Sequence, residues 1–315
     1  MSAYLIRGTA VALSEFVLIY FATWATIAAA WLLCTKRPHR DIHATSTLLY
    51  GLQLSPFVLS TLMTALLVIP AFVRFEPLRG EEEFGPPIII LGSFCLLLFA
   101  LGLWRAGNAV LQTGRLVRRW HPRTSSSRNF AGIPIVETAA DAPPLVVAGL
   151  FRPRLYVSSS AAQVLSEAEL ARAIAHEASH VRRCDNVKKL VLCLCCVPPS
   201  RSIERRWLAS LELGADLDAV SSRHEALDLA SAIVKTSRLA GRSPDLAMTF
   251  ATPQSDLLQA RVDQLLSWET RTSRHSRVFR MVIAVGSLAA ALIVLAPFYS
   301  ATLLAVHEFS EFLVR

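Results

Sequence analysis

Four long apolar stretches dominate the pattern of hydrophobic and polar positions along the chain. Each has about the 20 residues that a helix needs to cross a bilayer, or slightly fewer, and none is charged at its centre. A buried core helix is the alternative, but such helices rarely stay free of charge for so long. The pattern therefore predicts four transmembrane helices, at residues 17–33 (extending back to Ala10 past Glu15), 48–73, 87–104 and 281–306.

The charges that flank these stretches predict how each span is oriented in the membrane, because Lys and Arg next to a span are retained on the cytoplasmic side. Basic residues follow the first and third stretches and precede the fourth, whereas residues 74–87 are net acidic. The amino terminus, the acidic loop and the tail at residues 307–315 are therefore expected outside, and residues 105–280 inside. The first stretch is too long for the apolar region of a cleaved signal peptide, so we expect a protein of the bacterial inner or plasma membrane.

Composition supports this interpretation. The chain is 53% hydrophobic and only 18% charged, whereas soluble proteins carry about a quarter charged residues. Much of the net charge of +8 lies in the loops that set the topology, so we expect the lipid bilayer, and no direct nucleic acid, as a partner. The six cysteines lie mostly in apolar runs, which favours a reducing compartment over a disulfide framework. Three of them lie in residues 187–199, which we interpret as a buried or membrane-facing helix rather than a metal or redox cluster.

Residues 105–280 are numerous enough for one compact cytoplasmic domain. Short apolar runs predict strands at residues 133–137, 145–147 and 155–157, and Pro153 suggests that the last of these is an edge strand. Ser166 and Glu169 form a capping-box pattern, which predicts a helix from Glu167 to about residue 190. A second helix is expected at about residues 203–221. The predicted segment is thus of the α+β class.

The first of these helices carries the chemistry. His176 and His180 are four residues apart and share a helix face, so both imidazoles can bind one zinc ion, with Glu177 beside the open coordination position. Zinc lowers the pKa of a bound water to about 7, and Glu177 can accept its proton. A solvated helix face is the alternative, and a third ligand distinguishes the two. Glu212 on the second helix supplies it, and Asp216, one turn later, can orient an imidazole.

The stretches that surround these residues resemble a known family. They are the run Gly-Leu-Phe-Arg-Pro-Arg-Leu-Tyr-Val-Ser at 149–158, the zinc motif with its continuation to Asn186, the 212–216 motif and, weakly, residues 255–266 with Arg261-Val262. This pattern is similar to the BlaR/MecR-type integral-membrane zinc metallopeptidases, which are gluzincins with an HExxH motif. The order of three spans, protease and one span also resembles that family.

The resemblance implies a mainly α membrane protein: three helices in residues 1–104, a zincin-like metalloprotease domain in 105–280, and a fourth helix with an external tail in 281–315. It implies that His176, His180 and Glu212 bind zinc, that Glu177 is the catalytic base, and that Asp216 orients a zinc-binding imidazole. Asp185 matches a motif position for which only a structural role can be argued. The expected activity is a zinc metalloendopeptidase that cleaves a cytoplasmic protein, for example a transcriptional repressor in signal transduction. An oligomer is compatible with the sequence.

Substrate binding is expected on the predicted edge strand, where a peptide could add to the free edge along Arg154, Leu155, Tyr156 and Val157; an ordinary structural strand is the alternative. The oxyanion-stabilising residue stays open, because Thr252-Pro253 stands where related proteases have a histidine before a proline. Tyr156, His224 and nearby arginines are the candidates.

Two other functions remain open at this point. One is a membrane quality-control protease, although such enzymes usually place spans directly after the zinc helix. The other is a non-proteolytic receptor or scaffold that binds zinc for stability and would not need Glu177. Signalling members of the family carry an external antibiotic-sensing domain after the last span. This chain ends at Arg315, so we expect any signal to arrive through the spans, the acidic loop or a separate partner.

Overall fold

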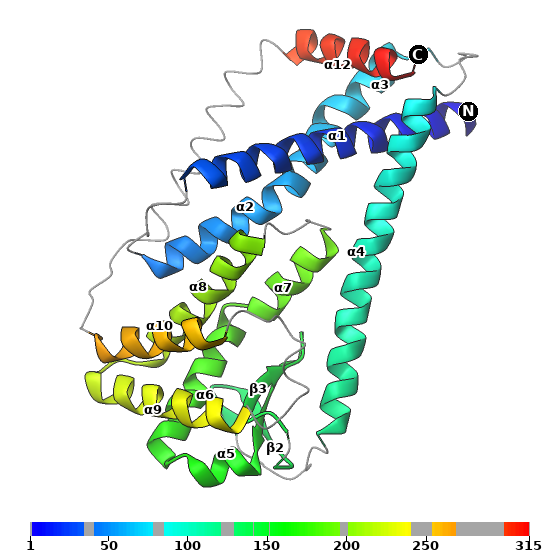
Figure 1. The fold of residues 1–315 in the computed structure, drawn as a ribbon. Helices are drawn as coiled ribbons and strands as arrows, with labels where there is room; N and C mark the ends of the chain where they lie inside the picture. Colours follow the sequence, from blue (N-terminus) through cyan, green and yellow to red (C-terminus); the bar gives the residue numbers. More distant parts are fainter. Residues whose placement is uncertain are drawn as a thin grey trace. The chain divides into compact units, whose positions relative to one another are not determined.

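The computed structural model is mainly helical, with one small sheet (Figure 1). It describes residues 2–34, 41–77, 85–120, 129–140, 142–150, 152–195, 201–240, 254–268 and 299–314.

Among the described residues, three helices are long and apolar enough to cross a membrane. The first is α1 (Ser2–Cys34). The second runs through α2 (Ile42–Met63), the π-helical turn η1 (Thr64–Val68) and α3 (Ile69–Phe75), and the third is α4 (Pro86–Arg119). They correspond to the first three predicted spans. The fourth predicted span falls mostly on residues 281–298, outside the described part of the chain, and its last residues begin α12 (Tyr299–Val314).

The second span stays helical through Pro56, although proline cannot donate the usual backbone hydrogen bond. Two buried polar side chains in this span bond to the helix itself: the Ser60 hydroxyl donates to the Pro56 carbonyl at 2.6 Å, and the Gln53 amide donates to the Leu49 carbonyl at 3.2 Å. Such bonds within the helix reduce the cost of polar groups in an apolar surrounding, whereas the buried Thr64 hydroxyl has no hydrogen-bond partner among the described residues.

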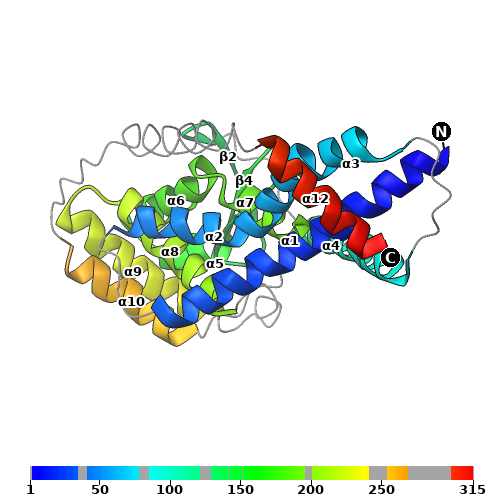
Figure 2. The same cartoon turned by 90° about the horizontal axis from the view of Figure 1, so that it is seen from above.

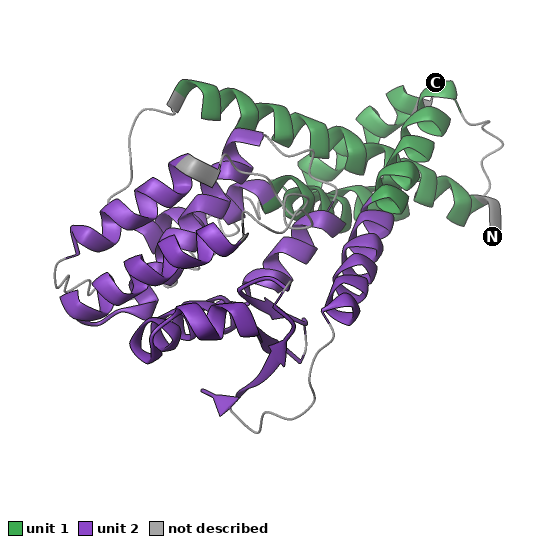
Figure 3. Ribbon diagram, turned by 60° about the horizontal axis from the view of Figure 1, so that its bottom comes forward, with its two compact units in different colours: residues 1–36, 54–101, 271–315 green, residues 37–53, 102–270 purple. Residues whose placement is uncertain are grey.

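The chain divides into two compact units (Figure 3). Unit 1 comprises residues 1–36, 54–101 and 271–315, and unit 2 comprises residues 37–53 and 102–270. The division into three parts expected from the sequence stays a prediction. Within unit 1, Val11, Val68, Phe72 and Ile88 form a buried core on which the α12 residue Val306 packs.

The sheet of unit 2 has the strand order β1-β2-β4-β3. Its strands are β1 (Asn129–Phe130), β2 (Ile133–Thr138), β3 (Leu145–Ala148) and β4 (Arg154–Ser158), so the three strands predicted from the sequence are confirmed. Strand β4 pairs in parallel with β2 and antiparallel with β3.

The interpretation of β4 as an edge strand is therefore wrong. Both of its sides are hydrogen-bonded, so a peptide cannot add along Arg154, Leu155, Tyr156 and Val157. Pro153 does not mark a sheet edge, because it precedes the strand, where no backbone donor to a neighbouring strand is needed. Among the described residues, β3 is the edge strand at the end of the sheet next to β4, and β1 is the edge strand at the other end.

Six helices follow the sheet in the described part of unit 2. They are α5 (Ser159–Val164), α6 (Glu167–Arg182), α7 (Asp185–Leu194), α8 (Arg201–Ala219), α9 (Arg223–Ala240) and α10 (Gln254–Leu266). The capping box that opens α6 is present as predicted. The predicted continuation of this helix to residue 190 is wrong, because Cys184 adopts a left-handed conformation (φ 55°) and starts a new helix at Asp185.

Helix α6 lies between the sheet and the later helices. Ile174 and Ala178 pack on the buried strand residues Leu155 and Val157, while Ala175 packs against the core shared by α9 and α10, which lie side by side (Figures 1 and 2). A helix buried on two sides is held firmly in position and rotation, and its remaining face is turned toward α8.

Candidate metal centre

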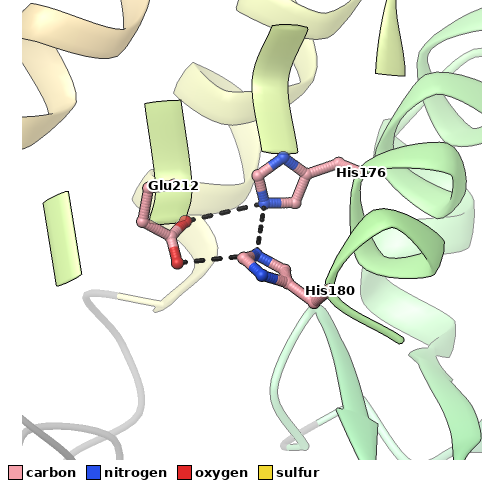
Figure 4. Close-up of side chains that lie close together, drawn as sticks. All are labelled: His176, His180 and Glu212. Carbon is pink, nitrogen blue, oxygen red and sulfur yellow. Dashed lines mark hydrogen bonds and ion pairs between the residues drawn. The ribbon is translucent and has the colours of Figure 1, made fainter. Parts of the chain in front are cut away.

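His176 and His180 on α6 and Glu212 on α8 converge on one point (Figure 4). The two Nε2 atoms are 3.2 Å apart. Glu212 Oε2 lies 3.5 Å from His176 Nε2, and Glu212 Oε1 lies 3.6 Å from His180 Nε2. The predicted spacing thus places both imidazoles on one helix face, opposite a carboxylate from the neighbouring helix.

These separations fit a metal ion. In tetrahedral zinc coordination with bonds of about 2.0–2.1 Å, neighbouring ligand atoms are about 3.3–3.4 Å apart. The two imidazole nitrogens lie near that spacing from each other, and each lies near it from one of the two Glu212 oxygens; two imidazoles and one carboxylate are a set that zinc accepts. The side chains of His176 and His180 are 8% and 13% exposed, whereas that of Glu212 is 28% exposed. This group could therefore hold a metal ion, and Glu212 is its most exposed member.

Each imidazole is oriented by a different buried carboxylate. His176 Nδ1 lies 2.9 Å from Asp216 Oδ1, and His180 Nδ1 lies 2.9 Å from Asp185 Oδ2. Hydrogen bonds and nearby positive charges lower the pKa of both carboxyls despite the opposing effect of burial. An ionised carboxylate only accepts hydrogen bonds, so each Nδ1 carries the proton and each Nε2 is left to face Glu212. The second orienting residue, Asp185, had no assigned chemistry in the sequence.

The local field favours a positive charge at the ligand group. Burial and Arg261 lower the pKa of His176, but hydrogen bonds to Asp216 and Glu212 raise it to about 9. Glu212 is desolvated too, and its pKa is nevertheless well below the ordinary value because His176, Arg261 and His180 stabilise its charge. Carboxylates held ionised around two imidazoles are suited to a divalent cation.

Arg261 on α10 is a central residue of this group that sequence reasoning did not assign. Its Nε and Nη2 donate to the two oxygens of Asp216 at 2.8 and 2.7 Å, and its Nη1 lies 3.0 Å from Glu212 Oε2. The only signal in the sequence was the weak family pattern at Arg261-Val262. The guanidinium fixes both carboxylates of α8 from a third helix.

Glu177 points toward the free side of β3. Its Oε2 accepts a hydrogen bond from the Val147 backbone N–H at 3.2 Å. Bonds across an antiparallel pair involve every second residue, and Ser158 N–H donates to the Pro144 carbonyl. Leu145 and Val147 therefore turn their backbone groups away from β4. The predicted catalytic carboxylate and the actual edge strand are in direct contact.

The remaining candidates are not brought to the ligand group. Tyr156 is buried in β4 and its ring contacts Trp120, and the side chain of His224 is 87% exposed on α9. Thr252-Pro253 lies outside the described residues. Gly214 on α8 leaves room for the guanidinium of Arg183, whose Nη1 would lie 2.6 Å from an added Cβ.

Comparison of the chain with protein-family models and with curated proteins finds no match.

Proposed function

We propose that this chain is a membrane-anchored zinc endopeptidase that hydrolyses peptide bonds of a cytoplasmic protein, of the kind that its motifs resemble. One observation carries the proposal: a three-residue group suited to a metal ion adjoins a glutamate that contacts the free edge of a strand. A site that binds metal only for stability requires neither that glutamate nor that edge.

In this proposal His176, His180 and Glu212 hold the zinc ion. When bound, zinc supplies a Lewis acid that polarises a peptide carbonyl and lowers the pKa of water. Glu177 takes the proton of the attacking water while the new C–O bond forms, and it passes that proton to the amide nitrogen as the C–N bond breaks. Asp216 and Asp185 keep the imidazoles oriented throughout.

The substrate lies along β3 in an extended conformation. Outward-facing backbone groups of Leu145 and Val147 can bond to the main chain of a peptide, which would add a fifth strand to the sheet. Glu177 now occupies the Val147 N–H, so peptide pairing competes with this contact and releases the carboxylate beside the scissile bond. Main-chain pairing selects an extended segment and leaves side-chain preference to the surroundings.

The test compares the detergent-purified chain with three variants, measuring zinc content and cleavage of casein together. We expect about one equivalent of zinc at this group in the wild type and its loss in Glu212→Ala. Glu177→Gln should keep the metal and lose cleavage. Glu167→Gln is the matched control, because it makes the same change at an exposed position on the same helix and should retain both.

Two results would contradict the proposal. Zinc content unchanged by Glu212→Ala would mean that the group is not the metal site. Cleavage retained by Glu177→Gln at full zinc occupancy would mean that the glutamate is not the base, and would favour a zinc-stabilised scaffold.

A further inference from the structure

Helix α7 carries an apolar stripe along its length. The members of this stripe follow the i, i+3, i+4, i+7 spacing of a single helix face: Val187, Leu190, Val191 and Leu194. Val187 is 36% exposed and Leu194 is 41% exposed. Asp185, which is buried and bonds to His180, lies on the opposite side of the helix, because the stripe is centred about half a turn away from it. The stripe therefore faces away from the ligand group.

The helix is too short to cross a bilayer. Its 10 residues extend about 15 Å at a rise of about 1.5 Å per residue, which is half of a hydrocarbon core of about 30 Å. An exposed apolar stripe marks a surface that binds another protein or a membrane, and amphipathic helices that bind membranes lie in the membrane surface. The position of α7 relative to the spans distinguishes between these two partners.

The ends of two predicted spans lie near α7 and the start of α8. Tyr50, near the start of the second predicted span, stacks on Trp207 of α8 with ring centroids 5.8 Å apart. Arg105 directly follows the third predicted span. Burial raises the pKa of the Cys193 thiol on α7 and of the Glu204 carboxyl on α8, and the positive charge of Arg105 opposes both shifts. All of these residues belong to unit 2, so the spans place this part of unit 2 at the level of the membrane surface.

Residues suited to lipid headgroups occur at the same span end and at the start of α8. Trp104, the last residue of the third predicted span, is 65% exposed, and tryptophan is enriched at membrane interfaces. Arg201 and Arg205 are exposed on the first two turns of α8, and basic side chains near a membrane are attracted to anionic lipids. An apolar stripe near indole and guanidinium groups matches acyl chains beneath anionic headgroups.

We propose that α7 lies in the surface of the bilayer, with its apolar stripe among the acyl chains and with Trp104, Arg201 and Arg205 at the level of the headgroups. The leaflet is the one next to unit 2, which the charge pattern predicts to be the cytoplasmic leaflet. The sequence left a buried and a membrane-facing helix open for this segment, and the exposed stripe favours the second. Because α7 begins with Asp185, which orients His180, the bilayer also holds the candidate metal centre close to the membrane surface.

The experiment uses the wild-type chain in vesicles of phosphatidylcholine and phosphatidylglycerol that contain a lipid with a diazirine in its acyl chain. Illumination attaches this lipid to the side chains that it contacts, and mass spectrometry of tryptic peptides locates the attachment. We expect adducts on Leu190, Val191 and Leu194, which lie in the tryptic peptide 190–201.

Two other peptides serve as controls. The span peptide 8–36 should be labelled, whereas Leu227 in the peptide 224–235, which is 44% exposed on α9, should carry no adduct. Adducts on α7 and on 8–36 without an adduct on Leu227 support the proposal. Adducts on 8–36 with none on α7 overturn it, and mean that the stripe faces water, a second copy of the chain or another protein. Equal labelling of α7 and Leu227 also overturns it, because the reagent then reports exposure alone.

A charged side chain provides a second test. Leu194→Glu places a carboxylate among acyl chains, where burying its charge is unfavourable, so we expect fewer adducts on Leu190 and Val191. Leu227→Glu makes the same change at the control position and should leave these adducts unchanged. Equal adduct yields in the wild type and in Leu194→Glu would contradict the proposed position of the stripe. Neither measurement depends on peptidase activity.

Discussion

Asp185→Asn offers the sharpest test of how the proposed zinc ligands are oriented. The Asp185 carboxylate is 1% exposed and accepts from His180 Nδ1 at 2.9 Å and from Lys188 Nζ at 3.0 Å. Asparagine keeps the shape and one acceptor oxygen but removes the charge. A hydrogen bond to a charged group contributes about 1.5–3 kcal/mol and a neutral one about 0.5–1.5 kcal/mol. The difference of about 1–1.5 kcal/mol predicts zinc affinity weakened about tenfold.

Chelator competition at fixed pH measures this change, and Asp218→Asn is the matched control. The Asp218 carboxylate accepts a hydrogen bond from the Ser179 hydroxyl at 2.9 Å, also between α6 and α8. Among the described residues it makes no bond to His176 or His180. We expect its zinc affinity to equal that of the wild type. If Asp185→Asn binds zinc as tightly as the wild type, while Asp216→Asn weakens binding, then His180 does not depend on Asp185 and the reasoning is refuted.

Three further predictions concern stability. Burial opposes ionisation of Glu169, but hydrogen bonds from Lys235, Ser231 and the Ser166 backbone lower its pKa to about 2. The ionised Glu169 carboxylate therefore stabilises the fold fully above about pH 4.5, and this stabilisation is lost as the pH falls toward 2. Between pH 5 and pH 3, the free energy of unfolding measured with denaturant should fall less for Glu169→Gln than for the wild type. Gly149 has φ 109° and an added Cβ would lie 2.6 Å from the Arg152 carbonyl oxygen, so Gly149→Ala should cost about 1–3 kcal/mol in the same assay, and an unchanged midpoint would contradict this. Ala178→Leu overfills the buried contact between α6 and the sheet and should also cost about 1–3 kcal/mol, seen as a lower melting temperature; equal melting temperatures would mean that the contact is loose.

Local patterns predicted the local features of this fold. Three spans, three strands, the capping box at Ser166 and the start of α6 all follow from short-range periodicity and capping chemistry. The helix break at Cys184 did not follow, because a cysteine in the left-handed conformation has no sequence signature and the apolar pattern continues through it. Strand order was also beyond a local argument, since it depends on which segments pair over long distances.

The ligand group shows the same division between local and long-range information. The four-residue spacing of His176 and His180 is a property of one helix, so the sequence alone predicts that they share a face. What orients them comes from elsewhere: Asp185 from the next helix, Asp216 from α8, and Arg261 from α10, which binds Asp216. Each imidazole has its own orienting carboxylate, so the hydrogen bond to one imidazole can be weakened without changing the other. We therefore expect the Asp185→Asn and Asp216→Asn variants to reduce zinc affinity independently, so that their effects on the binding free energy add in the double variant. Non-additive effects would instead reveal coupling through Glu212, which both imidazoles approach.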